Sequence, residues 1–158
     1  MQESKVIISA FADEDHRLRI LVESLSPDQQ TRTCDDGMCI RALLCHIAVW
    51  DKAVVDFFTK KISGESSEHS IHSFVELEKQ NKEKESDLLL MCFSDIYNEY
   101  IETTIKLQNF ILRNWLDMSD DEQGYFSIPL QHRRHHRHKF EKALDLPDSQ
   151  NRERAITA

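Results

Sequence analysis

Apolar side chains recur at intervals of three and four residues along most of this chain, a spacing that places them on one face of an α-helix. In residues 38–62, for example, one face would carry Leu43, His46, Ile47, Trp50, Val54 and Phe57. The 158 residues include only 3 glycines and 3 prolines, too few for the closely spaced turns of a β-protein. The sequence therefore predicts an all-α fold.

Breaks in this pattern divide the chain into long helical segments, expected over about residues 3–25, 38–62, 88–116 and 129–144. Residues 26–29 and 119–122 each begin with a serine that is followed three residues later by Gln or Glu, the pattern of a capped helix start. Residues 63–87 form a long connection with a short, solvated helix at 74–84, long enough for the flanking helices to run parallel. We expect one domain over residues 1–146 and a frayed polar tail over 147–158.

The formal net charge of −8 repels phosphate backbones and argues against binding to nucleic acid. No run approaches the ~18 apolar residues of a membrane span, so we expect no membrane partner. The first residues lack the pattern of a signal peptide, and a cytoplasmic location is therefore expected. The cysteines match neither a zinc knuckle nor a disulfide framework and are expected to be free and mostly buried: Cys34, Cys39, Cys45 and Cys92.

Four of the 8 histidines lie within residues 132–138. At about 100° per residue, a helix places His132 and His136 on its apolar arc, with His135 at the flank and His138 facing water. His46 lies on the apolar face of another segment. Two imidazoles from one helix and a third from a neighbouring helix can share one metal ion and leave a coordination position open. The alternative is a solvated histidine-rich face, with His46 as an ordinary core residue.

Basic side chains flank these histidines: Arg133, Arg134, Arg137 and Lys139. They could bind phosphate, but the favoured interpretation is that they form the solvated outer face of the helix. Asp51, about one helical turn after His46, is a candidate hydrogen-bond partner for that imidazole. Cys45 would point about 100° away from His46 and is not expected to share its metal.

Residues 36–51 resemble the second-helix signature of the DinB-like superfamily, in which a Gly-Trp pair precedes a helix that contains His-x-x-x-Trp. Here the corresponding residues are Gly37, His46 and Trp50, with Met38 in place of the usual tryptophan and Cys39 in place of Ser or Thr. Residues 132–140 resemble the family's His-x-x-x-His segment, and the breaks at 24–29 and 118–123 resemble its inter-helix sequences. The resemblance covers about residues 3–146.

The resemblance implies a four-helix bundle of up-down-down-up topology, with a long crossover between its second and third helices. It also implies that His46, His132 and His136 hold a zinc or nickel ion. Known activities of the family include transfer and isomerisation with low-molecular-weight thiols, and homodimers are common. We therefore expect a divalent-metal-dependent enzyme that acts on a small molecule, by transfer or hydrolysis involving such a thiol.

Two alternatives stay open. The ClbS/DfsB-like branch shares the second-helix signature but generally lacks the complete histidine set, and some of its members act on reactive small molecules without metal. A metal-free small-molecule-binding or protective bundle is therefore the main alternative, although the presence of both His132 and His136 favours the metal branch. The third hypothesis is an interaction protein whose acidic surface binds a basic partner.

Overall fold

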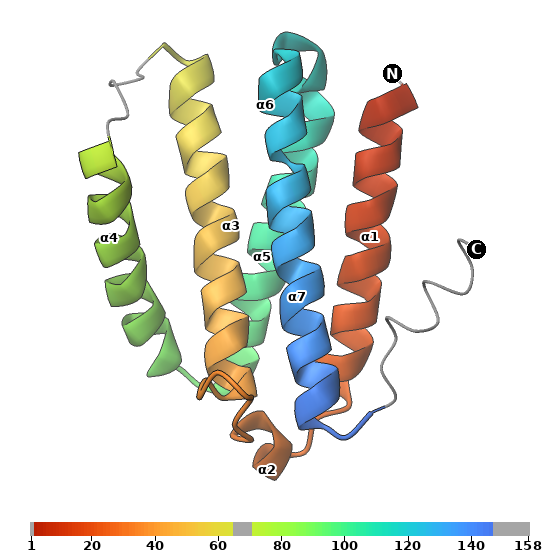
Figure 1. The fold of residues 1–158 in the computed structure, drawn as a ribbon, viewed down its shortest axis with the longest axis vertical. Helices are drawn as coiled ribbons and strands as arrows, with labels where there is room; N and C mark the ends of the chain where they lie inside the picture. The colour runs from red at the N-terminus through yellow and green to blue at the C-terminus, as the bar shows by residue number, and fades with distance from the viewer. Residues whose placement is uncertain (1, 65–70, 147–158) are drawn as a thin grey trace. The chain divides into compact units, whose positions relative to one another are not determined.

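The computed structural model describes residues 2–64 and 71–146, and their regular structure is helical (Figure 1). The long helices are α1 (Gln2–Glu23), α3 (Ile40–Ile62), α4 (Ile71–Leu89), α5 (Phe93–Asn114) and α7 (Ser127–Ala143). The short ones are α2 (Pro27–Gln30), the 3-10 helix η1 (Trp115–Asp117) and α6 (Asp120–Tyr125). No β-strand forms in this part of the chain, so the all-α prediction is confirmed. The tail expected over 147–158 lies outside the described residues.

Both predicted capping boxes are present and fix where α2 and α6 begin. The backbone N–H of Ser26 donates to the Gln29 side chain at 2.8 Å, while the Ser26 hydroxyl accepts the N–H of Gln29. Ser119 and Glu122 repeat the arrangement, with a backbone-to-carboxylate distance of 2.7 Å. These bonds satisfy N–H groups that have no partner within a helix at its first turn.

Helix α4 is longer than the short solvated helix predicted over 74–84. It has 19 residues, and its Asn81 and Leu88 side chains are buried. The prediction was wrong because one face of this polar helix carries Leu77, Asn81, Glu85 and Leu88, which is helical spacing with a polar residue at two of its four positions.

The boundary between α4 and α5 also differs from the prediction, which began the later helix at Leu88. Leu88 belongs to α4, the chain turns after Leu89, and the Cys92 carbonyl accepts the first backbone hydrogen bonds of α5. The prediction placed Leu88 and Leu89 in the later helix, whereas both belong to α4 and Leu88 completes its buried face. Among the described helices, none combines the length and hydropathy needed to cross a membrane.

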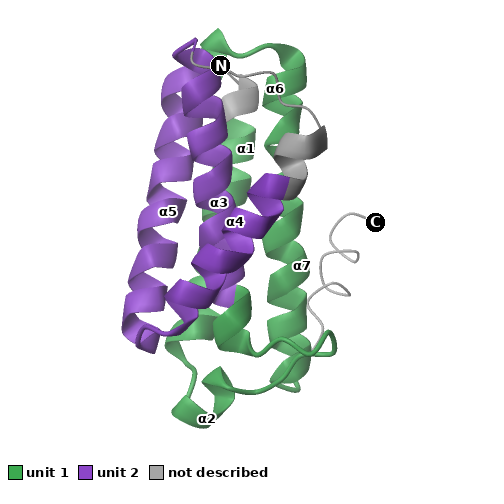
Figure 2. Ribbon diagram, turned by 90° about the vertical axis from the view of Figure 1, so that its left-hand side faces the viewer, with its two compact units in different colours: residues 1–43, 115–158 green, residues 44–114 purple. Residues whose placement is uncertain are grey.

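The chain divides into two compact units, residues 1–43 with 115–158 and residues 44–114 (Figure 2). In the first unit, α1 packs on α7. Its buried side chains include Phe11 and Leu18 from α1 and Leu130 and Phe140 from α7. Helix α3 begins in the first unit and continues without a break into the second.

The second unit contains α4, α5 and the greater part of α3. The rings of Phe58 on α3 and Phe110 on α5 lie 6.3 Å apart, and Lys52 pairs with Glu99 at 3.7 Å between the same helices. Tyr100 on α5 is fully buried. These contacts hold α3 and α5 together within this unit.

Candidate metal centre

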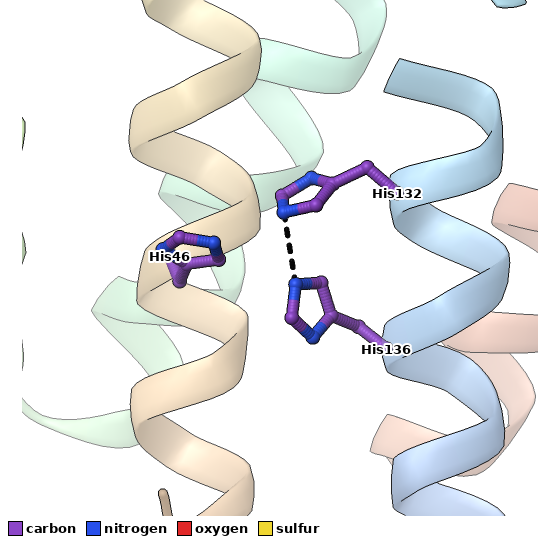
Figure 3. A group of neighbouring side chains, drawn as sticks. All are labelled: His46, His132 and His136. Atoms are coloured by element: carbon purple, nitrogen blue, oxygen red, sulfur yellow. Dashed lines mark hydrogen bonds between the residues drawn. The ribbon is translucent and has the colours of Figure 1, made fainter. Parts of the chain in front are cut away.

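His132 and His136 point towards one another from successive turns of α7 (Figure 3). Their Nε2 atoms lie 2.9 Å apart, and the two rings meet nearly edge-on with centroids 4.4 Å apart. His136 is buried and His132 is partly buried. The prediction that these two imidazoles share one face of the helix is confirmed.

The separation of the two nitrogens is compatible with a shared metal ion. At nitrogen–metal distances of about 2.0–2.1 Å, two ligand nitrogens stand about 2.9 Å apart for a right angle at the ion and about 3.4 Å apart for a tetrahedral angle. The observed separation of His132 Nε2 and His136 Nε2 is 2.9 Å. Without an ion, the same contact is a hydrogen bond in which one Nε2–H donates to the other ring. The geometry therefore suits either a ligand pair or a hydrogen-bonded pair.

Arg133 and Arg137, which were predicted to lie on the solvated outer face of this helix, are fully buried. Arg137 donates from Nε to Glu14 at 2.5 Å and from Nη1 to Glu141 at 2.8 Å. Arg133 pairs with Asp15 at 3.8 Å. The prediction was wrong for these two residues because α1 supplies carboxylates that make burial of the guanidinium groups possible.

The sequence does contain a signal for these buried ion pairs. Glu14 and Asp15 lie between Phe11 and Leu18, at the three-four spacing of the apolar stripe of α1. Acidic residues within such a stripe need a cation when they are buried, and the arginine-rich segment could have been recognised as its source. Arg134 is exposed, as the sequence predicted.

The ion pairs between α1 and α7 determine how α7 is rotated about its axis. Burial lowers the pKa of the Arg137 guanidinium, but hydrogen bonds and charges from Glu14 and Glu141 outweigh this effect and raise that pKa. Arg137 therefore stays charged and paired. Since successive helical residues differ by about 100°, the face that carries Arg133 and Arg137 lies about a quarter turn from that of His132 and His136. The contacts with α1 thus set the direction in which the histidine pair faces.

His135 and His138 are not part of this pair. His135 is exposed, whereas the His138 side chain, predicted to face water, is only 17% exposed and its Nδ1 lies 3.2 Å from Glu141 Oε2. The prediction for His138 was wrong because Glu141 binds His138 with one carboxylate oxygen and Arg137 with the other. The two histidines line a surface cavity of about 430 Å³ together with Lys139 and Lys142.

His46 lies on α3, in the second unit, and contacts a carboxylate that the sequence interpretation missed. Its Nδ1 is 2.8 Å from Oε1 of Glu85 on α4. The imidazole ring also lies 5.9 Å from the Trp50 ring. Asp51 was a candidate partner from the sequence, and the partner seen at Nδ1 is Glu85. The signal for Glu85 was its position on the buried face of α4.

The segment that leads into α3 is attached to the last turns of α7. Lys139 pairs with Asp36, and Lys142 pairs with Asp35 at 2.7 Å. Each lysine holds the pKa of its aspartate partner below the ordinary value through a hydrogen bond. Arg32 donates to a backbone carbonyl at the end of α7 at 3.0 Å. These contacts fix the chain just before α3 begins.

The donor chemistry of the predicted residues fits a transition metal. His46, His132 and His136 each offer one imidazole nitrogen as a possible metal ligand. Imidazole nitrogen suits zinc, nickel, copper and iron, so the ligand type alone does not select one of them.

Comparison of the chain with models of protein families, with curated proteins and with solved structures finds no match. The resemblance to the DinB-like superfamily therefore rests on the motif residues around Gly37, His46 and the His132–His136 pair.

Proposed function

We propose that His46, His132 and His136 jointly hold one divalent ion, zinc or nickel, and that the protein is a metal-dependent enzyme. The observation that carries this proposal is the 2.9 Å approach of the His132 and His136 Nε2 atoms. Such a pair supplies two of the three protein ligands typical of catalytic zinc, whose fourth position is open to water or substrate. His46 is the proposed third ligand.

The attachment of α3 to α7 supports a role for His46. Lys139 holds Asp36 just before α3, and His46 lies six residues into that unbroken helix, about 9 Å along its axis from Ile40. His136 lies three residues before Lys139, about 4.5 Å along α7. Because the Lys139–Asp36 contact lies close along the helices to both His46 and His136, it favours one shared site over two independent ones.

The proposed architecture is an up-down-down-up bundle of α1, α3, α5 and α7, with α4 in the crossover between α3 and α5. It is supported by the similar lengths of these helices, which have 22, 23, 22 and 17 residues, and by the packing of α1 on α7. A homodimer belongs to the same proposal and derives from the family resemblance.

The proposed reaction is transfer or hydrolysis in which a low-molecular-weight thiol attacks an electrophilic small molecule. A bound divalent ion supplies a Lewis acid that lowers the pKa of a coordinated water or thiol. The three imidazoles would hold the ion, and the Arg137–Glu14 contact would keep α7 turned so that its two histidines serve as ligands. The formal charge of −8 favours a small-molecule substrate over a nucleic acid.

One observation favours the metal-free alternative. The His132–His136 contact is also a satisfactory hydrogen bond between neutral imidazoles, and it needs no ion to form. A small-molecule-binding bundle without metal is therefore the second candidate, and it predicts ligand binding that a chelator does not change.

Metal content and thermal unfolding separate the two candidates. After purification without chelator and loading with zinc or nickel, the metal proposal predicts about one ion per chain and a lower Tm on addition of EDTA, since binding to the folded state stabilises it. A chain with His132→Ala and His136→Ala should lose both properties. His16→Ala, which removes an exposed histidine on α1, is the matched control and should retain them. A wild-type chain that binds no ion and ignores EDTA would favour the metal-free bundle.

A further inference from the structure

A contact between His46 and Glu85 joins two helices through a pair of polar atoms. His46 Nδ1 and Glu85 Oε1 lie 2.8 Å apart, and the two side chains are 23% and 19% exposed. Both belong to the second unit, His46 on α3 and Glu85 on α4. This partial burial limits competition from water and strengthens the contact relative to one on an open surface.

An ionised carboxylate can only accept hydrogen bonds, whereas a neutral imidazole has one nitrogen that donates and one that accepts. A carboxylate oxygen at hydrogen-bond distance from Nδ1 therefore requires the proton on that nitrogen. The lone pair of the neutral His46 ring then lies on Nε2, the nitrogen that would bind a metal ion. Which nitrogen binds the metal is decided by the hydrogen bond that the other nitrogen makes.

We propose that Glu85 is a positioning residue that keeps the His46 proton on Nδ1 and so presents Nε2 as a metal ligand. This inference rests on the proposed metal site and adds a member to it from α4, a helix that the sequence assigned to a solvated connection. Glu85 also restrains the imidazole, because the ring is held between this hydrogen bond and the neighbouring Trp50 ring, 5.9 Å away.

The position of Glu85 on its helix agrees with this role. The side chains at 81 and 88, which share its face, are fully or nearly buried. Glu83, two residues earlier, is exposed and lies on a different face. Glu83→Ala therefore removes a negative charge from α4 without changing the face that carries Glu85, and it serves as the control variant.

The tautomer of His46 can be measured without metal, by nitrogen-15 NMR on the metal-free protein at a pH where the imidazole is neutral. The expected result is a proton on Nδ1 in the wild-type chain and a shift of the population towards Nε2–H in Glu85→Ala. A wild-type His46 that carries its proton on Nε2 would overturn the inference.

Metal affinity is then measured by competition with a chromophoric chelator, using zinc and nickel as the probes. Loss of such an outer partner typically weakens metal binding 10–100-fold, which is roughly the effect expected for Glu85→Ala. Glu85→Gln keeps the size of the side chain and removes its charge, so it is less prone to misfold than Glu85→Ala. It should give an intermediate loss of metal affinity. Glu83→Ala should bind as the wild type does.

The outcomes separate this inference from the proposed function. A wild-type chain that binds neither ion overturns both. A wild-type chain that binds metal through its histidines, together with a folded Glu85→Ala variant of unchanged affinity, overturns only the role of Glu85.

Discussion

The Nε atom of Arg137 on α7 lies 2.5 Å from Oε1 of Glu14 on α1, and both side chains are buried. Such a pair is a poor source of net stability, since both charges give up their hydration. The pair instead fixes the rotation of α7 about its axis, because any rotation that separates the two groups leaves a charge buried and unpaired. The direction of the His132–His136 pair therefore depends on a contact on a different face of α7.

Removal of one partner of this ion pair should be far more damaging than removal of both. Glu14→Leu or Arg137→Met alone is expected to lower the free energy of unfolding by about 3–5 kcal/mol, while the double variant should recover much of that loss. Urea denaturation of the two single variants and the double variant gives the coupling between them. Lys106→Met breaks an exposed pair with Glu102 on α5 and should cost less than about 1 kcal/mol. Strictly additive losses in the double variant would contradict the account.

Asn81 should be replaceable by an apolar residue at no cost to stability. Its side chain is fully buried, and neither its amide nitrogen nor its oxygen has a hydrogen-bond partner among the described residues. An unsatisfied buried polar group costs about 1–3 kcal/mol, so Asn81→Leu is expected to raise the Tm.

The matched change Asn81→Asp should do the opposite, because it places a carboxyl group at the same buried position. Differential scanning calorimetry of both variants tests whether Asn81→Leu raises the Tm and Asn81→Asp lowers it. A lower Tm for Asn81→Leu would show that the amide makes a contact that stabilises the fold.

Cys34 should lose its proton only in strongly alkaline solution. Burial, reinforced by the charges of Asp36 and Asp35, raises the pKa of its thiol from 9.0 to about 11. As pH rises, the unfolded chain loses this proton first, so the associated stability is complete below pH 9.0 and is lost as the pH approaches 11. The free energy of unfolding should therefore fall more steeply between these pH values in the wild type than in Cys34→Ala.

Alkylation followed by mass spectrometry gives an independent check of the same shift. At pH 8 only about one Cys34 side chain in a thousand would be a thiolate, and the thiolate is the reactive form. The exposed Cys92 should be modified first at this pH. Alkylation of Cys34 as fast as that of Cys92 would be inconsistent with a buried, protonated thiol.

The sequence predicted those parts of the molecule that depend on local spacing. Ser26 with Gln29 and Ser119 with Glu122 are contacts within one helical turn, and the His132–His136 alignment follows from the pitch of a single helix. The all-α class follows from the same periodicity. Each of these features is determined by residues close together in the chain.

The errors concern contacts between segments far apart in the chain. The burial of Arg137 depends on Glu14, and the carboxylate at His46 Nδ1 comes from Glu85 on α4. In both cases the available signal was a charged residue at the helical spacing of the buried face. The spacing of hydrophobic residues along one helix does not show which residue pairs with a buried charge. That partner comes from another helix, so it depends on how the helices pack.

X-ray absorption spectroscopy of the zinc-loaded or nickel-loaded protein is the sharpest test of one ion held by His46, His132 and His136. A shared site predicts a first coordination shell of nitrogen and oxygen atoms at about 2.0–2.2 Å with scattering from three imidazole rings. The rings should fall to two in a His46→Ala variant that still binds the ion. A shell dominated by sulfur at about 2.3 Å, or a wild-type spectrum with at most one imidazole, would contradict it.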